Sequence, residues 1–164
     1  MIKQVLAVIA GLAFATPVPV FATGWKDVNL LKELVSGTGT KVLLQNCTEG
    51  GVYGYYEYNP SADVDTLVIC SNTTDHKDPD AVWETLAHEA THAMQACAGG
   101  PIVEDVIVPR MLRELQELTP HYYRILMSYA SSEKRTELEA FWMELRHPEY
   151  VINTFIKLCY TKDK

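Results

Sequence analysis

The chain has 164 residues, of which 48% are hydrophobic and 21% charged, and its formal net charge at pH 7 is −7. This length fits a single globular domain. An acidic chain without a basic stripe repels phosphates, which argues against a nucleic-acid-binding protein.

The first 22 residues have the pattern of a secretory signal peptide. Lys3 supplies a positive start, residues 5–15 are apolar, and Pro17 and Pro19 precede the small residue Ala22. The short, proline-interrupted apolar run favours a cleaved signal over the alternative, an uncleaved membrane anchor. We expect cleavage after Ala22 and one domain over residues 23–164. Since residues 1–22 hold one lysine and no acid, that domain carries −8. It would be exported, periplasmic or secreted, with no membrane contact afterwards.

The four cysteines, Cys47, Cys70, Cys97 and Cys159, all follow this segment. An even number of cysteines in an exported chain predicts disulfides, although four cysteines allow three pairings. We expect Cys47–Cys70, which would fix the ends of two strand-like runs. We also expect Cys97–Cys159, which would fasten the last helix to the helix that contains Cys97.

The first half of the domain predicts one helix and a small sheet. A short amphipathic helix is expected over residues 27–35, before a glycine-rich turn. Three strand-like runs follow at residues 41–47, 52–58 and 66–71. An antiparallel β-meander is the most economical arrangement of these runs. Their tyrosines are expected on the sheet surface, with substrate contact as the alternative; they are Tyr53, Tyr55, Tyr56 and Tyr58.

The second half is predicted to be helical, which makes the fold class α+β. Asp78 is a typical N-cap, Pro79 suits the first helical position, and Gly99 suits the C-cap of a helix that ends at Ala98. Further helices are expected over residues 104–118, from 120, over 131–146, and from 148 onward.

The helix that ends at Ala98 contains an H-E-x-x-H pentad, which runs from His88 through Glu89 to His92. Residues four apart share a helix face, so both imidazoles can bind one ion. Two neutral imidazoles suit Zn²⁺, and Glu89 lies where it can reach a water beside the metal. The alternative is a chance match on a solvated face, which the clear helix signals around the pentad disfavour.

A catalytic zinc site needs a third protein ligand. Glu137 and Glu139 flank the apolar face of the helix predicted over residues 131–146, on opposite sides and by similar angles. Periodicity therefore does not choose between them, and both could instead be solvated surface acids. The apolar face itself consists of Leu138, Phe141, Trp142 and Leu145.

The pentad followed by Glu137-Leu138-Glu139-Ala140 resembles the gluzincin zinc peptidases. In many of these the later motif is E-x-x-A-D, and its first glutamate is the third zinc ligand. The resemblance therefore implies Zn²⁺ on His88, His92 and Glu137. Phe141 stands at the family's aspartate position, which removes a carboxylate that would orient a ligating histidine. No third histidine follows His92 at the spacing of the metzincins.

The resemblance further implies a zincin-like minimal metallopeptidase that hydrolyses a peptide or protein, with Glu89 as general base. His121, Tyr122 or Tyr123 could stabilise the oxyanion, with core packing as the alternative for the helical tyrosines. The run 52–58 or 66–71 could hold an extended substrate. The alternative is a catalytically weak or inactive binding module that keeps the scaffold and a structural zinc. A secreted toxin or effector peptidase is a third interpretation.

Overall fold

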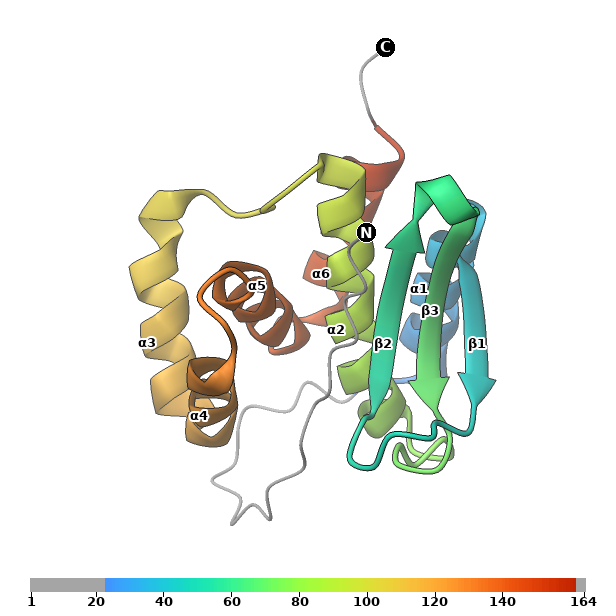
Figure 1. Ribbon diagram of the computed structural model, residues 1–164, viewed down its shortest axis with the longest axis horizontal. Coiled ribbons are helices and arrows are strands. Elements are labelled where there is room, and N and C mark those ends of the chain that lie inside the picture. The colour runs from blue at the N-terminus through green and yellow to red at the C-terminus, as the bar shows by residue number, and fades with distance from the viewer. Residues whose placement is uncertain (1–22, 162–164) are drawn as a thin grey trace.

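The computed structural model describes residues 23–161, and the predicted signal peptide lies outside these residues. Six α-helices and a three-stranded sheet form the α+β fold that the sequence predicts (Figure 1). No helix within the described residues is long and apolar enough to cross a bilayer. The elements in order are α1 (Trp25–Gly37), β1 (Lys41–Gln45), β2 (Gly54–Asn59), the 3₁₀ turn η1 (Pro60–Ala62), β3 (Val64–Cys70), α2 (Pro79–Ala98), η2 (Asp105–Ile107), α3 (Val108–Leu118), α4 (Pro120–Ser128), α5 (Lys134–Glu144) and α6 (Pro148–Cys159).

Helix α2 has the boundaries that its sequence predicts. The Asp78 side chain caps it by accepting a hydrogen bond from the Asp80 amide, and Pro79 occupies the first turn. At the other end Gly99 adopts a left-handed conformation with φ 77°, and the Gly100 amide donates to the Gln95 carbonyl. Both caps depend only on residues near the helix ends, so the sequence alone predicts where α2 begins and ends.

The sheet differs from the predicted antiparallel meander. Its strand order is β1-β3-β2, with β1 parallel to β3 and β2 antiparallel to β3. In a meander β1 and β3 would lie on either side of β2, about 10 Å apart, because neighbouring strands are spaced by about 4.8 Å. A disulfide needs Cα atoms within about 7 Å, so a bridge between the ends of β1 and β3 requires them to be neighbours. The meander was therefore wrong, and it conflicted with the predicted Cys47–Cys70 bridge.

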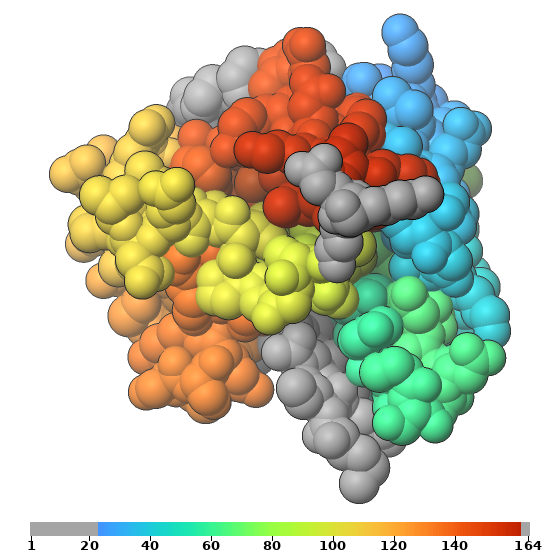
Figure 2. All heavy atoms as spheres, turned by 90° about the horizontal axis from the view of Figure 1, so that it is seen from above, coloured from blue at the N-terminus to red at the C-terminus, as the bar shows by residue number. Residues whose placement is uncertain are grey.

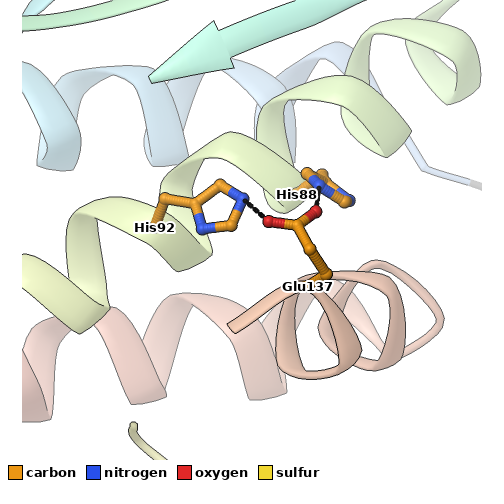
Figure 3. A group of neighbouring side chains, drawn as sticks. All are labelled: His88, His92 and Glu137. Atoms are coloured by element: carbon orange, nitrogen blue, oxygen red, sulfur yellow. Dashed lines mark ion pairs between the residues drawn. The ribbon is translucent and has the colours of Figure 1, made fainter. Parts of the chain in front are cut away.

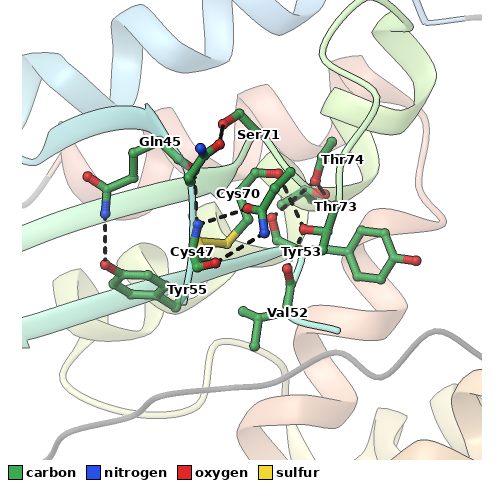
Figure 4. The surroundings of a disulfide bond; sticks show 12 residues. Gln45, Cys47, Val52, Tyr53, Tyr55, Cys70, Ser71, Thr73 and Thr74 are labelled. Carbon is green, nitrogen blue, oxygen red and sulfur yellow. Dashed lines mark hydrogen bonds between the residues drawn. A yellow bond between two sulfur atoms is a disulfide. The ribbon is translucent and has the colours of Figure 1, made fainter. Parts of the chain in front are cut away.

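Both predicted disulfides are confirmed. Cys47 bonds to Cys70 and Cys97 bonds to Cys159, each with a Cα–Cα distance of 5.3 Å. The first joins the segment after β1 to the last residue of β3, in a network of hydrogen bonds with the neighbouring loops (Figure 4). The second ties the end of α6 to the end of α2. Both bridges therefore hold segments that support α2.

Helix α2 lies at the centre of the molecule. It packs on α1, β2 and β3 on one side and on α5 and α6 on the other. Seen from above, the sheet and the α3–α4 helices lie on opposite sides, with the end of α2 and α6 between them (Figure 2). Because α2 is covered on several sides, polar residues on it become buried wherever another element packs against them, and the pentad lies within that buried stretch.

Candidate metal centre

The pentad histidines and Glu137 converge between α2 and α5. His88 Nε2 lies 3.5 Å from one Glu137 carboxylate oxygen, and His92 Nε2 lies 3.5 Å from the other. Figure 3 shows both imidazoles on one face of α2, turned toward the glutamate on the first turn of α5. Two atoms bound to one tetrahedral zinc ion at about 2.0–2.1 Å lie about 3.3 Å apart. The observed spacing is close to that of ligands around a single ion.

The ligand atoms of this group are buried and have no hydrogen-bond partner in the described part of the chain. This holds for Nε2 of His88, Nε2 of His92 and both carboxylate oxygens of Glu137. Leaving buried polar atoms unpaired costs free energy, so such a cluster calls for a ligand. The three residues can therefore hold a metal ion, and no other group of three such side chains in residues 23–161 has this geometry.

The pKa values of the two imidazoles are shifted in opposite directions. Burial by itself would lower the pKa of His88, but its contacts with Glu137 and Glu144 outweigh burial and raise this pKa well above its usual range. Burial lowers the pKa of His92, although the charge of Glu137 opposes the shift. Metal binding would require both imidazoles in their neutral form.

Each histidine is oriented through its other ring nitrogen. Nδ1 of His88 lies 3.1 Å from Oε2 of Glu144, and Nδ1 of His92 lies 2.9 Å from Oε1 of Gln95. Carboxylate and amide partners of this kind fix the ring and its tautomer, so Nε2 is left to face the site.

Glu144 corrects one expectation drawn from the sequence. Phe141 was expected to leave the histidine without an orienting carboxylate, yet Glu144, three residues further along α5, supplies one. Phe141 instead packs its ring against His88 at 4.8 Å between centroids. The signal for Glu144 was its position seven residues after Glu137, two helical turns along the same face.

The structure separates Glu139 from Glu137. Glu139 is fully buried and accepts hydrogen bonds from the Gln95 side chain and from the amides of Ile102 and Val103, and Arg135 forms an ion pair with it at 3.2 Å. Its carboxylate therefore holds the segment that follows α2 and lies outside the metal group. Neither glutamate is the solvated surface acid that the sequence allowed.

Glu89 lies beside the metal group and opens onto a cavity. The residue is buried, and its Oε2 has no hydrogen-bond partner among the described residues. Glu89 and His88 both line a cavity of about 350 Å³, a volume within the usual range of ligand sites. Burial raises the pKa of Glu89 to about 8, with His88 opposing and the charges of Glu137 and Glu144 adding to the rise.

Among the three residues considered for oxyanion binding, His121 and Tyr122 line this cavity and Tyr123 does not. Tyr129, which follows α4, was missed. Its hydroxyl is buried, and burial together with the charges of Glu137 and Glu89 raises the pKa of this phenol. A tyrosine just after a helix gives no sequence signal, and only the docking of α4 on α5 brings Tyr129 to the site.

Residues 45–160 match the family described as a domain of unknown function, DUF8637. The chain belongs to this family. The matched range runs from the last residue of β1 to the residue after α6, so it contains every residue of the metal group in this DUF8637 protein. No curated protein matches the chain, and no solved structure does.

Proposed function

We propose that this DUF8637 protein is a zinc metallopeptidase, with His88, His92 and Glu137 as the zinc ligands. The observation that carries the proposal is the convergence of three buried residues, whose ligand atoms have no hydrogen-bond partner among the described residues, with a further buried residue, Glu89, that faces a cavity. A His₂Glu set with an open position is the donor set of catalytic zinc. A site that only stabilised the fold would have no need of the acid or the cavity.

Zinc at this site would supply a Lewis acid that activates water and polarises a peptide carbonyl. Glu89 accepts a proton from the attacking water as the new C–O bond forms, and donates it to the leaving nitrogen as the C–N bond breaks. Glu144 and Gln95 keep the two imidazoles in register during these steps. The hydroxyl of Tyr129 lies near the carboxylates of Glu137 and Glu89 and would donate a hydrogen bond there.

Strand β2 is the better candidate for holding an extended substrate. β3 is paired on both of its edges, whereas β2 pairs only with β3 within the described residues. β2 also packs on α2, and Gly54 lies directly against Thr85 and Glu89. A peptide that adds to the β2 edge would therefore lie beside Glu89.

The test uses the protein that starts at Thr23, with its disulfides formed. We expect one zinc per chain by elemental analysis and hydrolysis of an unfolded protein substrate. Glu89→Gln should keep the zinc and lose hydrolysis by at least about 100-fold. Glu117→Gln removes an equal charge from the exposed face of α3 and should change neither property.

Two results would contradict the proposal. Absence of stoichiometric zinc from the unaltered protein would remove the metal centre. Stoichiometric zinc without hydrolysis of any peptide in a broad library would indicate the binding module with a structural zinc instead.

A further inference from the structure

The cavity beside Glu89 is lined by acids and by apolar surface. Its polar wall carries Glu89 and Glu144 in the buried part, with Glu84 and Asp75 exposed at its edge. The apolar part of its wall comes from Tyr53, Ala81, Tyr122 and Ile125. We call this cavity the acidic pocket. Such a lining suits a group with an aliphatic stem and a cationic end.

None of the described side chains that line the acidic pocket is a lysine or an arginine, so no permanently charged cation lies in its wall. His121, its one other basic group besides His88, has a pKa lowered by burial and by Arg124, so it stays neutral. The nearby Arg146 is already engaged, with Glu114 at 2.9 Å and the Trp142 ring beneath it.

Two buried carboxylate oxygens in the acidic pocket lack a hydrogen-bond partner among the described residues, one from Glu89 and one from Glu144. Oε2 of Glu144 contacts His88, but Oε1 has no hydrogen bond within the described residues, and the Glu144 side chain is only 4% exposed. A buried carboxylate oxygen left without a donor is costly, so the pocket calls for a donor from outside.

The carboxyl groups around the pocket also favour a cationic ligand. Glu84, Glu89, Glu144 and Asp75 line the pocket, and Glu137 lies in the adjoining metal group. The pocket therefore offers carboxylate acceptors and no lysine or arginine among its described lining residues. A cationic group would be attracted and an acidic group repelled.

We propose that the acidic pocket receives a cationic group of the peptide substrate, so that cleavage is selective for peptides that place an ammonium or guanidinium there. This inference rests on the proposed peptidase function and names the substrate class of the same site. The cation could be a lysine or arginine side chain or the free amino terminus of the peptide.

A binding experiment separates this inference from the peptidase itself. The zinc-loaded Glu89→Gln protein is titrated with fluorescent peptides, and anisotropy gives the dissociation constants. One pair of acetylated peptides differs by lysine against norleucine at a single position, scanned along the sequence. A second pair differs by a free against an acetylated amino terminus, with norleucine throughout. Because Glu89→Gln is used, binding is measured whether or not the unaltered protein hydrolyses peptides, and Glu84, Glu144 and Asp75 remain as the carboxylates of the pocket.

We expect one pair to show tighter binding of the cationic member by about tenfold or more, the range of a charge-assisted hydrogen bond. Preference in the first pair assigns the pocket to a basic side chain, and preference in the second assigns it to the amino terminus. Adding Glu84→Gln should reduce the preference several-fold, whereas adding Glu117→Gln should leave it intact.

If Glu84→Gln fails to fold, Asp75→Asn is expected to reduce the preference for the cationic peptide in the same way. Zinc content checks that each variant keeps its metal centre. Equal binding of both members in both pairs would overturn the inference and leave the peptidase proposal standing. A cation preference that neither Glu84→Gln nor Asp75→Asn reduces would also overturn it, because the selectivity would then arise elsewhere.

Discussion

Glu144 and His88 are joined across the α2–α5 interface, with Oε2 of the acid 3.1 Å from Nδ1 of the ring. The contact links the second half of α5 to the pentad helix, while Glu137, two turns earlier on α5, meets the opposite nitrogen of the same ring at 3.5 Å. His88 is thus held from both sides by one helix. The docking of α5 on α2 sets the geometry of the metal group.

Replacing Glu144 should weaken metal binding without touching a ligand. We expect Glu144→Ala to lower zinc affinity by about 10–100-fold, because the His88 ring loses its orienting partner. Glu144→Gln keeps an oxygen for the Nδ1–H and should have the smaller effect. Competition with a chromogenic chelator measures the affinities. Unchanged affinity in Glu144→Ala would show that packing against Phe141 orients the ring by itself.

The two glutamates of α5 should fail in different ways. Glu137→Gln should lose stoichiometric zinc while the fold is retained, since only the metal group depends on it. Glu139→Gln should keep one zinc per chain but unfold more easily by about 1–3 kcal/mol, because a buried acceptor of several hydrogen bonds is lost. In a domain of this size that lowers the melting temperature by several degrees. Elemental analysis and thermal unfolding of both variants decide between the roles, and zinc loss confined to Glu139→Gln would reverse the assignment.

Much of this arrangement was readable from the sequence where the signal is local. The ends of α2, the pentad on one helix face and the near-symmetric placement of Glu137 and Glu139 all follow from residues within a turn or two of each other. The choice between the two glutamates does not, because periodicity gives an angle around a helix and not the direction of the neighbouring helix. Glu144 was missed although it lies on the same helix face as Glu137, and Tyr129 was missed because a tyrosine just after a helix gives no sequence signal.

In the sheet, the disulfide between distant cysteines carries information on strand order that the turn residues between strands do not. Turn residues between successive runs suggested a meander, and turn signals carry no information on which strands become neighbours. The expected Cys47–Cys70 bridge did carry that information, since it places the ends of β1 and β3 side by side. A Cys47–Cys70 bridge therefore excludes β2 as the central strand.

Gly54 should be needed where β2 meets the pentad helix. A Cβ there would come within 2.6 Å of the Thr85 methyl and 2.8 Å of the Val68 carbonyl oxygen, and within 3.2 Å of Glu89 Cγ. Gly54→Ala must therefore move β2 or α2, and we expect a loss of about 1–3 kcal/mol in stability. Any hydrolysis should fall further than stability alone explains, because Glu89 is displaced.

Gly50→Ala is the matched control for Gly54, because a Cβ at position 50 meets nothing within 4 Å. Thermal unfolding, zinc content and peptide turnover are compared for the two variants. Zinc should stay in both, since no ligand lies on β2. Identical behaviour of the two variants would show that the sheet can shift without moving Glu89.

Acid should weaken the contact between α3 and α5. Partial burial would raise the pKa of Glu114, but hydrogen bonds from Arg110 and Trp142 and the charge of Arg146 lower it below its usual range. A carboxyl whose folded pKa is lowered contributes stability that is present above the unfolded pKa and is lost as pH falls through the folded pKa. Glu114→Gln should therefore cost up to about 1 kcal/mol at pH 7 and little near pH 2. Melting temperatures across this range test it, and a cost independent of pH would point to packing instead.

The predicted cleavage after Ala22 would place a new charge at the start of α2. The Thr23 nitrogen donates to Oδ1 of Asp80 at 2.8 Å, and Thr23 is buried against the first turn of that helix. After cleavage this nitrogen is an ammonium, so the hydrogen bond becomes an ion pair between the chain terminus and Asp80. We expect the protein that begins at Thr23 to be about 1 kcal/mol more stable than one that begins a few residues earlier, where the nitrogen is an amide. Asp80→Asn should remove most of that difference, whereas Asp63→Asn, in the turn before β3, should preserve it.

N-terminal sequencing of exported material establishes the cleavage site, and thermal unfolding of the paired proteins measures the difference in stability. Equal stability of the two lengths would show that the amide already satisfies Asp80, and an exported chain that begins elsewhere would remove the ion pair altogether.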